Sequence, residues 1–222
     1  MTAGSKVVVF GTGVFAECVW FYLTHDSDHE VVAFTVDGSH QDRDELLGLP
    51  VVPFESVAEL YPPGEHAMFV AAGYARVNRL RAEVCARAKA AGYELVTYVS
   101  SKATTWPGLA IGENCFIFED NTIQPFSTIG DDVIMWSGNH LGHHSTVGDH
   151  CFVTSHVVIS GNVQVGAYSF VGVNATIRDS ISIGEANVIG AGAIIMKSTA
   201  DGEVYIAPRT KADSRSSDEL GM

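Results

Sequence analysis

The sequence has few basic residues, few cysteines and no long apolar run. Among its 222 residues, 13 lysines and arginines stand against 26 aspartates and glutamates, and the formal net charge is −13. Nucleic acids and anionic membranes are bound through clustered Lys and Arg, so this charge balance argues against both as partners. An anionic ligand must therefore be held locally, by backbone amides and a few basic side chains.

The four cysteines include no CxxC pair; they are Cys18, Cys85, Cys115 and Cys151. The sequence shows no signal peptide and no apolar run of transmembrane length. Hydrophobic residues make up 46% of the chain, which is enough for one or two domains with their own cores. We therefore expect a soluble, cytoplasmic protein.

A six-residue repeat dominates the second half of the sequence. Every sixth position is aliphatic or Met, and the residue four positions later is in most cases small or short. A period of six fits neither a helix nor an alternating strand, but it is typical of a parallel β-solenoid built from hexapeptides. The aliphatic series is Ile111, Ile117, Ile123, Ile129, Met135, Leu141, Val147, Val153, Ile159, Val165, Val171, Ile177, Ile183, Ile189 and Ile195.

The residue types of the repeat follow from this architecture. Three hexapeptides form one triangular coil, in which the aliphatic residue fills the interior and the small residue faces inward near a corner. Successive coils pair through parallel strands about 4.8 Å apart, and each coil buries its apolar face only against its neighbours. Cys115 and Cys151 occupy the small inward position, so we predict buried thiols there rather than disulfides.

The first hundred residues show a different pattern, in which apolar strands alternate with helices. The predicted strands are 6–10, 30–37, 67–72 and 93–99, and the predicted helices are 14–25, 55–61 and 75–91. This alternation predicts a small parallel sheet with helices on its faces. We divide the chain into an α/β Rossmann-like domain at residues 1–100, an all-β solenoid at 101–206 and a C-terminal tail at 207–222.

The helix predicted for residues 75–91 is amphipathic. Its expected buried stripe comprises Val77, Leu80, Val84 and Ala88. A helix that covers a sheet exposes its opposite side to water, and the arginines of this segment are placed largely there. They are Arg76, Arg79, Arg81 and Arg87.

A glycine turn between the first strand and the first helix is a candidate phosphate site. The turn runs Gly11-Thr12-Gly13-Val14-Phe15, and it presents backbone amides and a helix N-terminus. Asp37, at the end of the second strand, is placed to accept a hydrogen bond from a ribose or uracil group. The alternative is a bare turn that uses glycine for its geometry. A domain of this size is about half a dinucleotide-binding unit, which favours a ligand with one nucleotide.

Histidines concentrate on the solenoid, where five of the nine fall between residues 140 and 156. Because Leu141 points inward, His143 is expected at a corner, facing outward. A neutral imidazole there can accept a proton from an attacking amine or hydroxyl group. Two alternatives stay open: exposed corners tolerate His, and His clusters bind zinc, although this spacing matches no familiar ligand pattern.

The chain as a whole, from Phe10–Gly13 to the last hexapeptide, resembles a known enzyme family. These are the left-handed β-helix sugar acyltransferases with an N-terminal nucleotide-sugar-binding domain, which include bacillosamine and perosamine N-acetyltransferases and the sialic acid O-acetyltransferase-like group. The resemblance implies a homotrimer with acetyl-CoA in the groove between adjacent solenoids. It also implies a nucleotide sugar bound by the N-terminal domain and a role in cell-surface polysaccharide synthesis.

The resemblance also implies roles for individual residues. His143 matches the catalytic base, and His144 stands where relatives usually have an acidic residue, so His140 or Asn139 is considered as the orienting group instead. The second nucleotide-contacting turn matches Gly73 and Tyr74. The residues matched to the CoA path are Ser160, Gly161, Asn162, Gly172, Gly190, Gly192, Lys197 and Arg209.

The expected activity is N-acetylation of a nucleotide-linked amino sugar by acetyl-CoA, without a resident metal. The alternatives are O-acetylation by the same fold, a zinc hydratase like the γ-carbonic anhydrases, and a non-catalytic scaffold.

Overall fold

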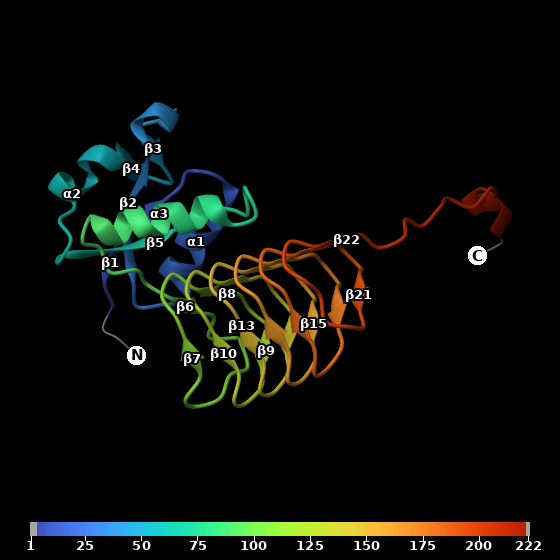
Figure 1. Ribbon diagram of the computed structural model, residues 1–222. Coiled ribbons are helices and arrows are strands. Elements are labelled where there is room, and N and C mark those ends of the chain that lie inside the picture. The colour runs from blue at the N-terminus through green and yellow to red at the C-terminus, as the bar shows by residue number, and fades with distance from the viewer. Residues whose placement is uncertain (1–3, 221–222) are drawn as a thin grey trace.

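The computed structural model describes residues 4–220, which form an α/β domain followed by a long prism of short strands (Figure 1). Four strands of the N-terminal sheet are parallel and lie in the order β4, β2, β1, β5. Their bounds are β1 Lys6–Phe10, β2 Glu30–Val36, β4 Leu49–Pro53 and β5 His66–Val70. A fifth strand, β3 (Glu45–Leu46), is antiparallel to β4. The Rossmann-like prediction is therefore confirmed only in part, because the sheet is mixed.

The alternation of side chains along β1 sends apolar groups to both faces of the sheet. Val7 and Val9 pack with α1 (Val14–His25), whereas Val8 packs under α2 (Val57–Leu60) and α3 (Arg79–Ala90). Short 3₁₀ turns occupy Gly38–His40, Phe54–Ser56 and, in the tail, Ser217–Leu220. Across the described residues, no helix combines the length and apolar composition that crossing a bilayer requires.

Two of the predicted elements in the N-terminal domain were wrong in detail. The segment 93–99 is not one strand of the sheet, because only Leu95 bridges to β5, while β6 (Tyr98–Val99) pairs with the solenoid strand β8. The helix predicted at 75–91 begins only at Arg79. The preceding residues form a loop in which Arg76, Val77 and Asn78 all have positive φ, a conformation that no right-handed helix contains.

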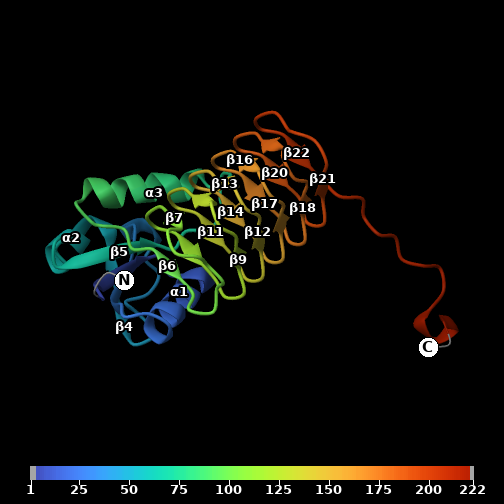
Figure 2. The ribbon, with the colours of Figure 1, turned by 90° about the horizontal axis from the view of Figure 1, so that it is seen from below.

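The C-terminal half is a parallel β-helix with three faces, as the six-residue repeat predicts (Figure 2). Each hexapeptide contributes a two-residue strand, and strands pair in parallel at a spacing of eighteen residues along the chain, except that β20 pairs with β22 at a spacing of sixteen. Face 1 comprises β7 (Ala110–Ile111), β10 (Thr128–Ile129), β13 (Thr146–Val147), β16 (Gln164–Val165) and β19 (Ser182–Ile183). Face 2 comprises β6, β8 (Phe116–Ile117), β11 (Ile134–Met135), β14 (Phe152–Val153), β17 (Phe170–Val171), β20 (Val188–Ile189) and β22 (Val204–Tyr205). Face 3 comprises β9 (Thr122–Ile123), β12 (His140–Leu141), β15 (Val158–Ile159), β18 (Thr176–Ile177) and β21 (Ile194–Ile195).

The interior of the prism contains the aliphatic series predicted from the sequence. From Ile117 onward these side chains are buried in one continuous core, together with Cys115 and Cys151. The residue three positions after each aliphatic one adopts a left-handed backbone, and it is commonly Asn, Asp, His or Gly. Those residue types tolerate positive φ, which explains why His144, His150 and His156 recur at corners. Much of the histidine cluster is thus a consequence of backbone geometry.

Face 2 binds the N-terminal domain because its outward residues are apolar. Phe116, Ile134, Phe152 and Phe170 point outward at successive levels of this face, where faces 1 and 3 more often carry polar residues. Three of the four belong to the buried cluster formed with α1 and the sheet, and Phe170 packs at its edge. The two parts of the chain therefore share one apolar interface.

The last coil is closed by side chains rather than by a further strand. Ser198, Thr199 and Asp201 accept hydrogen bonds from the backbone N–H groups of Ser182, Gly184 and Glu185, at distances of 2.8–3.1 Å. These contacts satisfy the free edge of β19, which would otherwise offer a template for pairing with another chain. Beyond β22 the tail runs away from the prism (Figure 1).

Candidate functional site

One part of the candidate site lies at the carboxyl edge of the N-terminal sheet. From β1 the chain passes first to β2 on one side and later to β5 on the other, so the strand order reverses between β1 and β5. In open parallel sheets, ligands bind at the carboxyl ends of the strands at such a reversal. The glycine turn after β1, Asp37 after β2, and Gly73 with Tyr74 after β5 all meet at this edge.

The glycine turn leaves the start of α1 open. Gly11 has a φ of +124°, and a Cβ there would lie 3.0 Å from the carbonyl oxygen of Ala71, so this position requires glycine. Gly13 is the N-cap of α1, no side chain caps the helix, and a Cβ on Gly13 would meet no atom within 4 Å. The first amides of α1 therefore face free space, as a phosphate-binding helix N-terminus needs.

Asp37 already has a partner in this structure. Arg87 of α3 donates hydrogen bonds to both of its carboxylate oxygens and stacks over Phe54, with the guanidinium carbon 4.6 Å from the ring centroid. The hydrogen bonds from Arg87 lower the pKa of Asp37, which keeps the carboxylate ionised. Asp37 is 29% exposed, so it can still accept a hydrogen bond from a ligand hydroxyl group.

Arg81 ties the Gly73–Tyr74 loop to the solenoid, contrary to the prediction that the arginines of this helix face water. Its side chain is fully buried, and its Nε donates to Asp132 at 2.7 Å. Its terminal nitrogens donate to the carbonyl groups of Gly73, Asp132, His150 and Cys151 and to the amide oxygen of Asn78. The sequence pattern missed this residue because its partners on the solenoid lie some fifty to seventy positions further along the chain.

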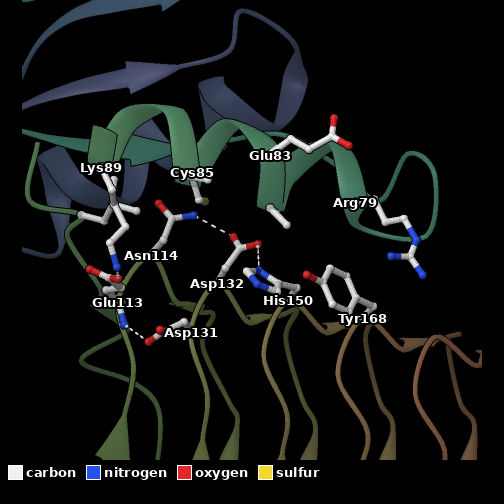
Figure 3. A pocket seen from close by; sticks show the side chains of 13 residues that line it. Arg79, Glu83, Cys85, Lys89, Glu113, Asn114, Asp131, Asp132, His150 and Tyr168 are labelled. Atoms are coloured by element: carbon white, nitrogen blue, oxygen red, sulfur yellow. Dashed lines mark hydrogen bonds and ion pairs between the residues drawn. The ribbon is translucent and has the colours of Figure 1, made fainter. Parts of the chain in front are cut away.

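A cavity of about 580 Å³ lies between α3 and the corner that joins faces 1 and 2 (Figure 3). On its wall, His150 Nδ1 lies 2.9 Å from Asp132, and Asn114 donates to the same carboxylate. The His150 ring is tilted against Tyr168, with centroids 4.7 Å apart. None of the candidate catalytic, CoA-binding or substrate-binding residues predicted from the sequence lines this cavity. Its polar side chains form hydrogen bonds mainly with one another.

The other part of the candidate site is the corner between faces 3 and 1, which we call the 3–1 corner (residues 142–145). His143 and His144 are both exposed there, and their Nδ1 atoms lie 3.2 Å apart. The backbone N–H of His143 donates to the Gln124 side chain at 2.9 Å, one coil below. Gln124 was not predicted from the sequence, although coil stacking brings it beside residue 142.

Phe126 also belongs to this corner and was missed. Its ring is 76% exposed and lies 4.8 Å from the His144 ring. A bulky residue with a φ of +66° is unusual, since this conformation favours glycine and asparagine. A hollow of about 230 Å³ opens beside it, lined by residues 106–109 and 123–127. The positive φ is shared by the equivalent position of the other hexapeptides, so the exposed ring is the feature that distinguishes this corner.

The structure brings only some of the predicted catalytic residues together. Asn139 is buried, donates to the carbonyl of Trp136 and accepts from the backbone N–H of Val157, so its side chain is used inside the prism rather than on His143. His140 lies in β12 on face 3, paired with Thr122 and Val158. His144, by contrast, contacts His143 through the two Nδ1 atoms.

The residues matched to the CoA path fall at two corners. Ser160, Gly161 and Asn162 continue the 3–1 corner one coil above His143, and the Asn162 N–H donates to the His143 carbonyl at 2.8 Å. A Cβ on Gly161 would lie 2.7 Å from Cε1 and Nε2 of His143, so glycine is needed there to make room for the ring.

Gly172, Gly190 and Gly192 lie instead at the corner between faces 2 and 3. Gly172 and Gly190 are needed by the stacking itself, because a Cβ on either would come within 3 Å of the next coil's backbone. Gly192 has a φ of +71°. Lys197 follows β21 on the exposed end of the prism, and Arg209 lies in the exposed tail.

The cysteines offer no reactive thiolate at this site. Burial raises the pKa of both Cys115 and Cys151 to about 12, so each thiol stays protonated at neutral pH. A covalent acyl-cysteine intermediate at these positions is therefore disfavoured. Among residues 4–220, no three His, Cys, Asp or Glu side chains are grouped so as to hold a metal ion.

No protein-family model matches the sequence, and a search of curated proteins finds no match. Solved structures do match over nearly the whole chain. A variant of perosamine N-acetyltransferase from Caulobacter crescentus, in complex with CoA and GDP-perosamine, is 27% identical with a TM-score of 0.82, covering 90% of this chain and 92% of its own. PerB from the same organism, also with CoA and GDP-perosamine, is 26% identical with a TM-score of 0.79, covering 90% and 93%.

The acetyltransferase domain of PglB from Neisseria gonorrhoeae FA1090 is 24% identical with a TM-score of 0.79, covering 90% of this chain and 96% of its own, and at that identity the likeness concerns the fold alone. The resemblance to the sugar acyltransferases with an N-terminal domain and a hexapeptide solenoid is confirmed by these neighbours.

Proposed function

We propose that the chain is an acyltransferase that moves the acetyl group of acetyl-CoA to the amino group of a nucleotide-linked sugar. The observation that carries the proposal is the similarity of the whole chain to perosamine N-acetyltransferase structures that contain CoA and GDP-perosamine. The open glycine turn at the reversal of the N-terminal sheet supports nucleotide binding, and the exposed imidazole at the 3–1 corner supports base catalysis.

The two parts of this site lie on opposite sides of one chain. The N-terminal domain covers face 2, whereas His143 lies at the corner opposite that face, with the packed core between them. A sugar held at the glycine turn would have to pass around the prism to meet the His143 of its own chain. We therefore propose a homotrimer, in which the nucleotide sugar of one subunit meets the 3–1 corner of its neighbour.

The exposed surface of face 3 supports such an assembly. Val158 and Ile194 point outward there, and Val173 and Met196 flank the face, all four at least 40% exposed. Exposed apolar residues gathered on one face of a soluble protein are typical of a subunit interface. The groove between two such subunits would hold the pantetheine arm, with Gly161 beside the His143 ring.

The reaction needs no covalent enzyme intermediate. The sugar amine attacks the thioester carbon, a C–N bond forms, and the C–S bond breaks to release CoA. His143 Nε2 accepts the proton that leaves the amine and returns a proton to the departing sulfur. Bringing amine and thioester together in one groove supplies much of the rate acceleration. The similarity to N-acetyltransferase structures favours an amine acceptor over a hydroxyl group.

A thiol-release assay tests the proposal. Purified protein is mixed with acetyl-CoA and a panel of nucleotide-linked amino sugars, their hydroxyl analogues, and sugars without a nucleotide. We expect CoA release with at least one nucleotide-linked amino sugar, no effect of a metal chelator, and a product heavier by one acetyl group. Release that required the hydroxyl analogue would favour O-acetylation, and stoichiometric bound zinc without any CoA release would favour a zinc hydratase.

A further inference from the structure

The two exposed histidines of the 3–1 corner share one hydrogen bond. Nδ1 of His143 and Nδ1 of His144 lie 3.2 Å apart, and the ring planes are nearly perpendicular at 84°. The neighbouring coils hold the pair from both sides: Gly161 lies against the His143 ring from above, and Phe126 packs on the His144 ring from below.

A hydrogen bond between two ring nitrogens requires one donor and one acceptor. If His143 is to accept a proton at Nε2, its Nδ1 must already bear one, and that N–H then donates to a bare Nδ1 on His144. His144 in turn must bear its own proton on Nε2. The opposite assignment leaves His143 with an occupied Nε2 and no capacity as a base.

No carboxylate lies at this corner to take the role of acceptor. The corner segment below, residues 124–127, and the one above, residues 160–163, contain no titratable side chain. Two coils above His143, Arg178 and Asp179 face each other at 4.0 Å. On the same coil, His140 lies in β12 on face 3. Within the described chain, His144 is therefore the group available to orient His143.

We propose that His144 is a positioning residue that accepts the Nδ1 proton of His143 and so keeps Nε2 of His143 free to act as the base. This inference rests on the proposed function, in which His143 accepts a proton from the sugar amine. A singly protonated pair that kept the Nδ1–Nδ1 hydrogen bond would carry a proton on Nε2 of His143, where it would block the base.

The pair also differs from a histidine held by a carboxylate. A carboxylate would stabilise the imidazolium form of His143 by its charge, whereas a neutral imidazole stabilises it only by a hydrogen bond. The acid limb of the rate profile should therefore lie at lower pH than in a variant that carries a carboxylate at residue 144.

The tautomers can be read directly by ¹⁵N NMR of the full-length protein labelled at histidine, without CoA or sugar. Above the pH at which the pair takes up a proton, we expect His143 protonated on Nδ1 and His144 protonated on Nε2. A His143 ring protonated on Nε2 in the neutral pair would overturn the proposal. This measurement needs no enzymatic activity, so it is decided separately from the proposed function.

Three substitutions test the role in the reaction. Residue 144 has a φ of +56°, which Asn and Asp tolerate well, and their Oδ1 occupies nearly the place of the His Nδ1. We expect His144→Asn to keep turnover within about fivefold, because its amide oxygen still accepts the proton. His144→Asp should move the acid limb upward by about one pH unit. His144→Ala should lower kcat by about 10- to 100-fold with an unchanged Kd for CoA, since a misplaced base loses that much.

The matched control is His156→Asn, which makes the same change at the same position of another hexapeptide, at the corner between faces 2 and 3, where His156 also has positive φ. Its pH profile should match that of the wild type. If His144→Ala kept the wild-type kcat and acid limb, His144 would not position His143. That result, with acetyl transfer intact, would leave the proposed function standing and would point to a carboxylate supplied by a partner subunit.

Discussion

Gly161 and His143 occupy equivalent corner positions on successive coils, and the ring of one lies over the Cα of the other. A methyl group on Gly161 would lie 2.7 Å from the His143 ring, which is the mobile end of a side chain rather than backbone. The ring can therefore move away without cost to the coil. A substitution at Gly161 therefore changes the position of the His143 ring without changing the stability of the fold.

We predict that Gly161→Ala lowers kcat by roughly 10- to 100-fold, because a displacement of about 1 Å is enough to misplace a catalytic group. The melting temperature should stay near that of the wild type. Asp179→Ala, at the same corner one coil higher, is the control and should leave kcat unchanged. Steady-state kinetics and thermal denaturation of both variants test this prediction. A Gly161→Ala enzyme with normal kcat would contradict the position of the His143 ring against Gly161.

At the scale of elements, Asp26 joins the end of α1 to the start of the solenoid. Tyr98 donates to its carboxylate at 2.6 Å, and Ser100 and the Ser101 backbone donate at 3.0 and 2.9 Å. Burial by itself raises the pKa of Asp26, but these hydrogen bonds and one from the Ser101 hydroxyl outweigh it and lower the pKa from 3.8 to about 2. The ionised form is therefore favoured by folding.

The direction of the pKa shift of Asp26 determines the pH range in which this residue stabilises the folded protein. Because the pKa is lower in the folded state, Asp26 stabilises the protein fully above about pH 4, and the contribution is lost as pH falls towards 2. We predict that Asp26→Asn lowers the free energy of unfolding at pH 7 by about 1–3 kcal/mol, as expected for hydrogen bonds to a charged group. The difference in the free energy of unfolding between the wild type and Asp26→Asn, measured by urea denaturation, should be smaller in acid than at pH 7. A difference that is independent of pH, or equal to the one caused by exposed Asp28→Asn, would count against this role of Asp26.

Arg81 and Asp132 form a buried ion pair that links α3 to the solenoid. We predict that Arg81→Met lowers the free energy of unfolding by about 3–5 kcal/mol, because Asp132 is left as a buried charge without its partner. Replacing Asp132 with Asn in the same chain should recover part of the loss. The exposed Arg79→Met is the control, with an expected cost of at most about 1 kcal/mol. A loss below 1 kcal/mol for Arg81→Met, measured by urea denaturation, would contradict this role.

The sequence was sufficient to predict elements whose pattern repeats locally. The inward series from Ile117 to Ile195 is buried as expected, and the outward position of His143 follows from the inward position of Leu141. The segment 93–99 was assigned wrongly, because its strand character is local but its pairing with Phe116 is not. Arg81 was misplaced for the same reason, since a helix pattern does not contain the carboxylate that the chain supplies fifty-one residues later.

The contacts at the 3–1 corner were not predicted, although the repeat contained the information needed to find them. Gln124, Phe126 and Gly161 meet the histidines because each coil stacks on the one eighteen residues before it. That spacing was available from the repeat, so aligning the corners coil by coil would have found these residues. The neighbouring subunit of the proposed trimer cannot be read from a pattern within one chain.

At the scale of the whole molecule, the account requires an oligomer. Three chains of 23.7 kDa give a particle of about 71 kDa. We predict that wild-type protein sediments as this trimer and that Val158→Asp, in the centre of face 3, dissociates it and abolishes acetyl transfer. Gln164→Asp on face 1 places the same charge on another face and should leave the trimer intact. An active Val158→Asp monomer in sedimentation equilibrium would show that one chain suffices.

The most direct test of the central claim is to replace His143 and measure catalysis and CoA binding separately. The account predicts that His143→Ala lowers kcat with acetyl-CoA and the accepted nucleotide-linked amino sugar by about 10²- to 10⁴-fold, the usual contribution of a general base, while calorimetry gives a Kd for CoA close to that of the wild type. A His143→Ala enzyme that turned over at a near-normal rate would contradict it.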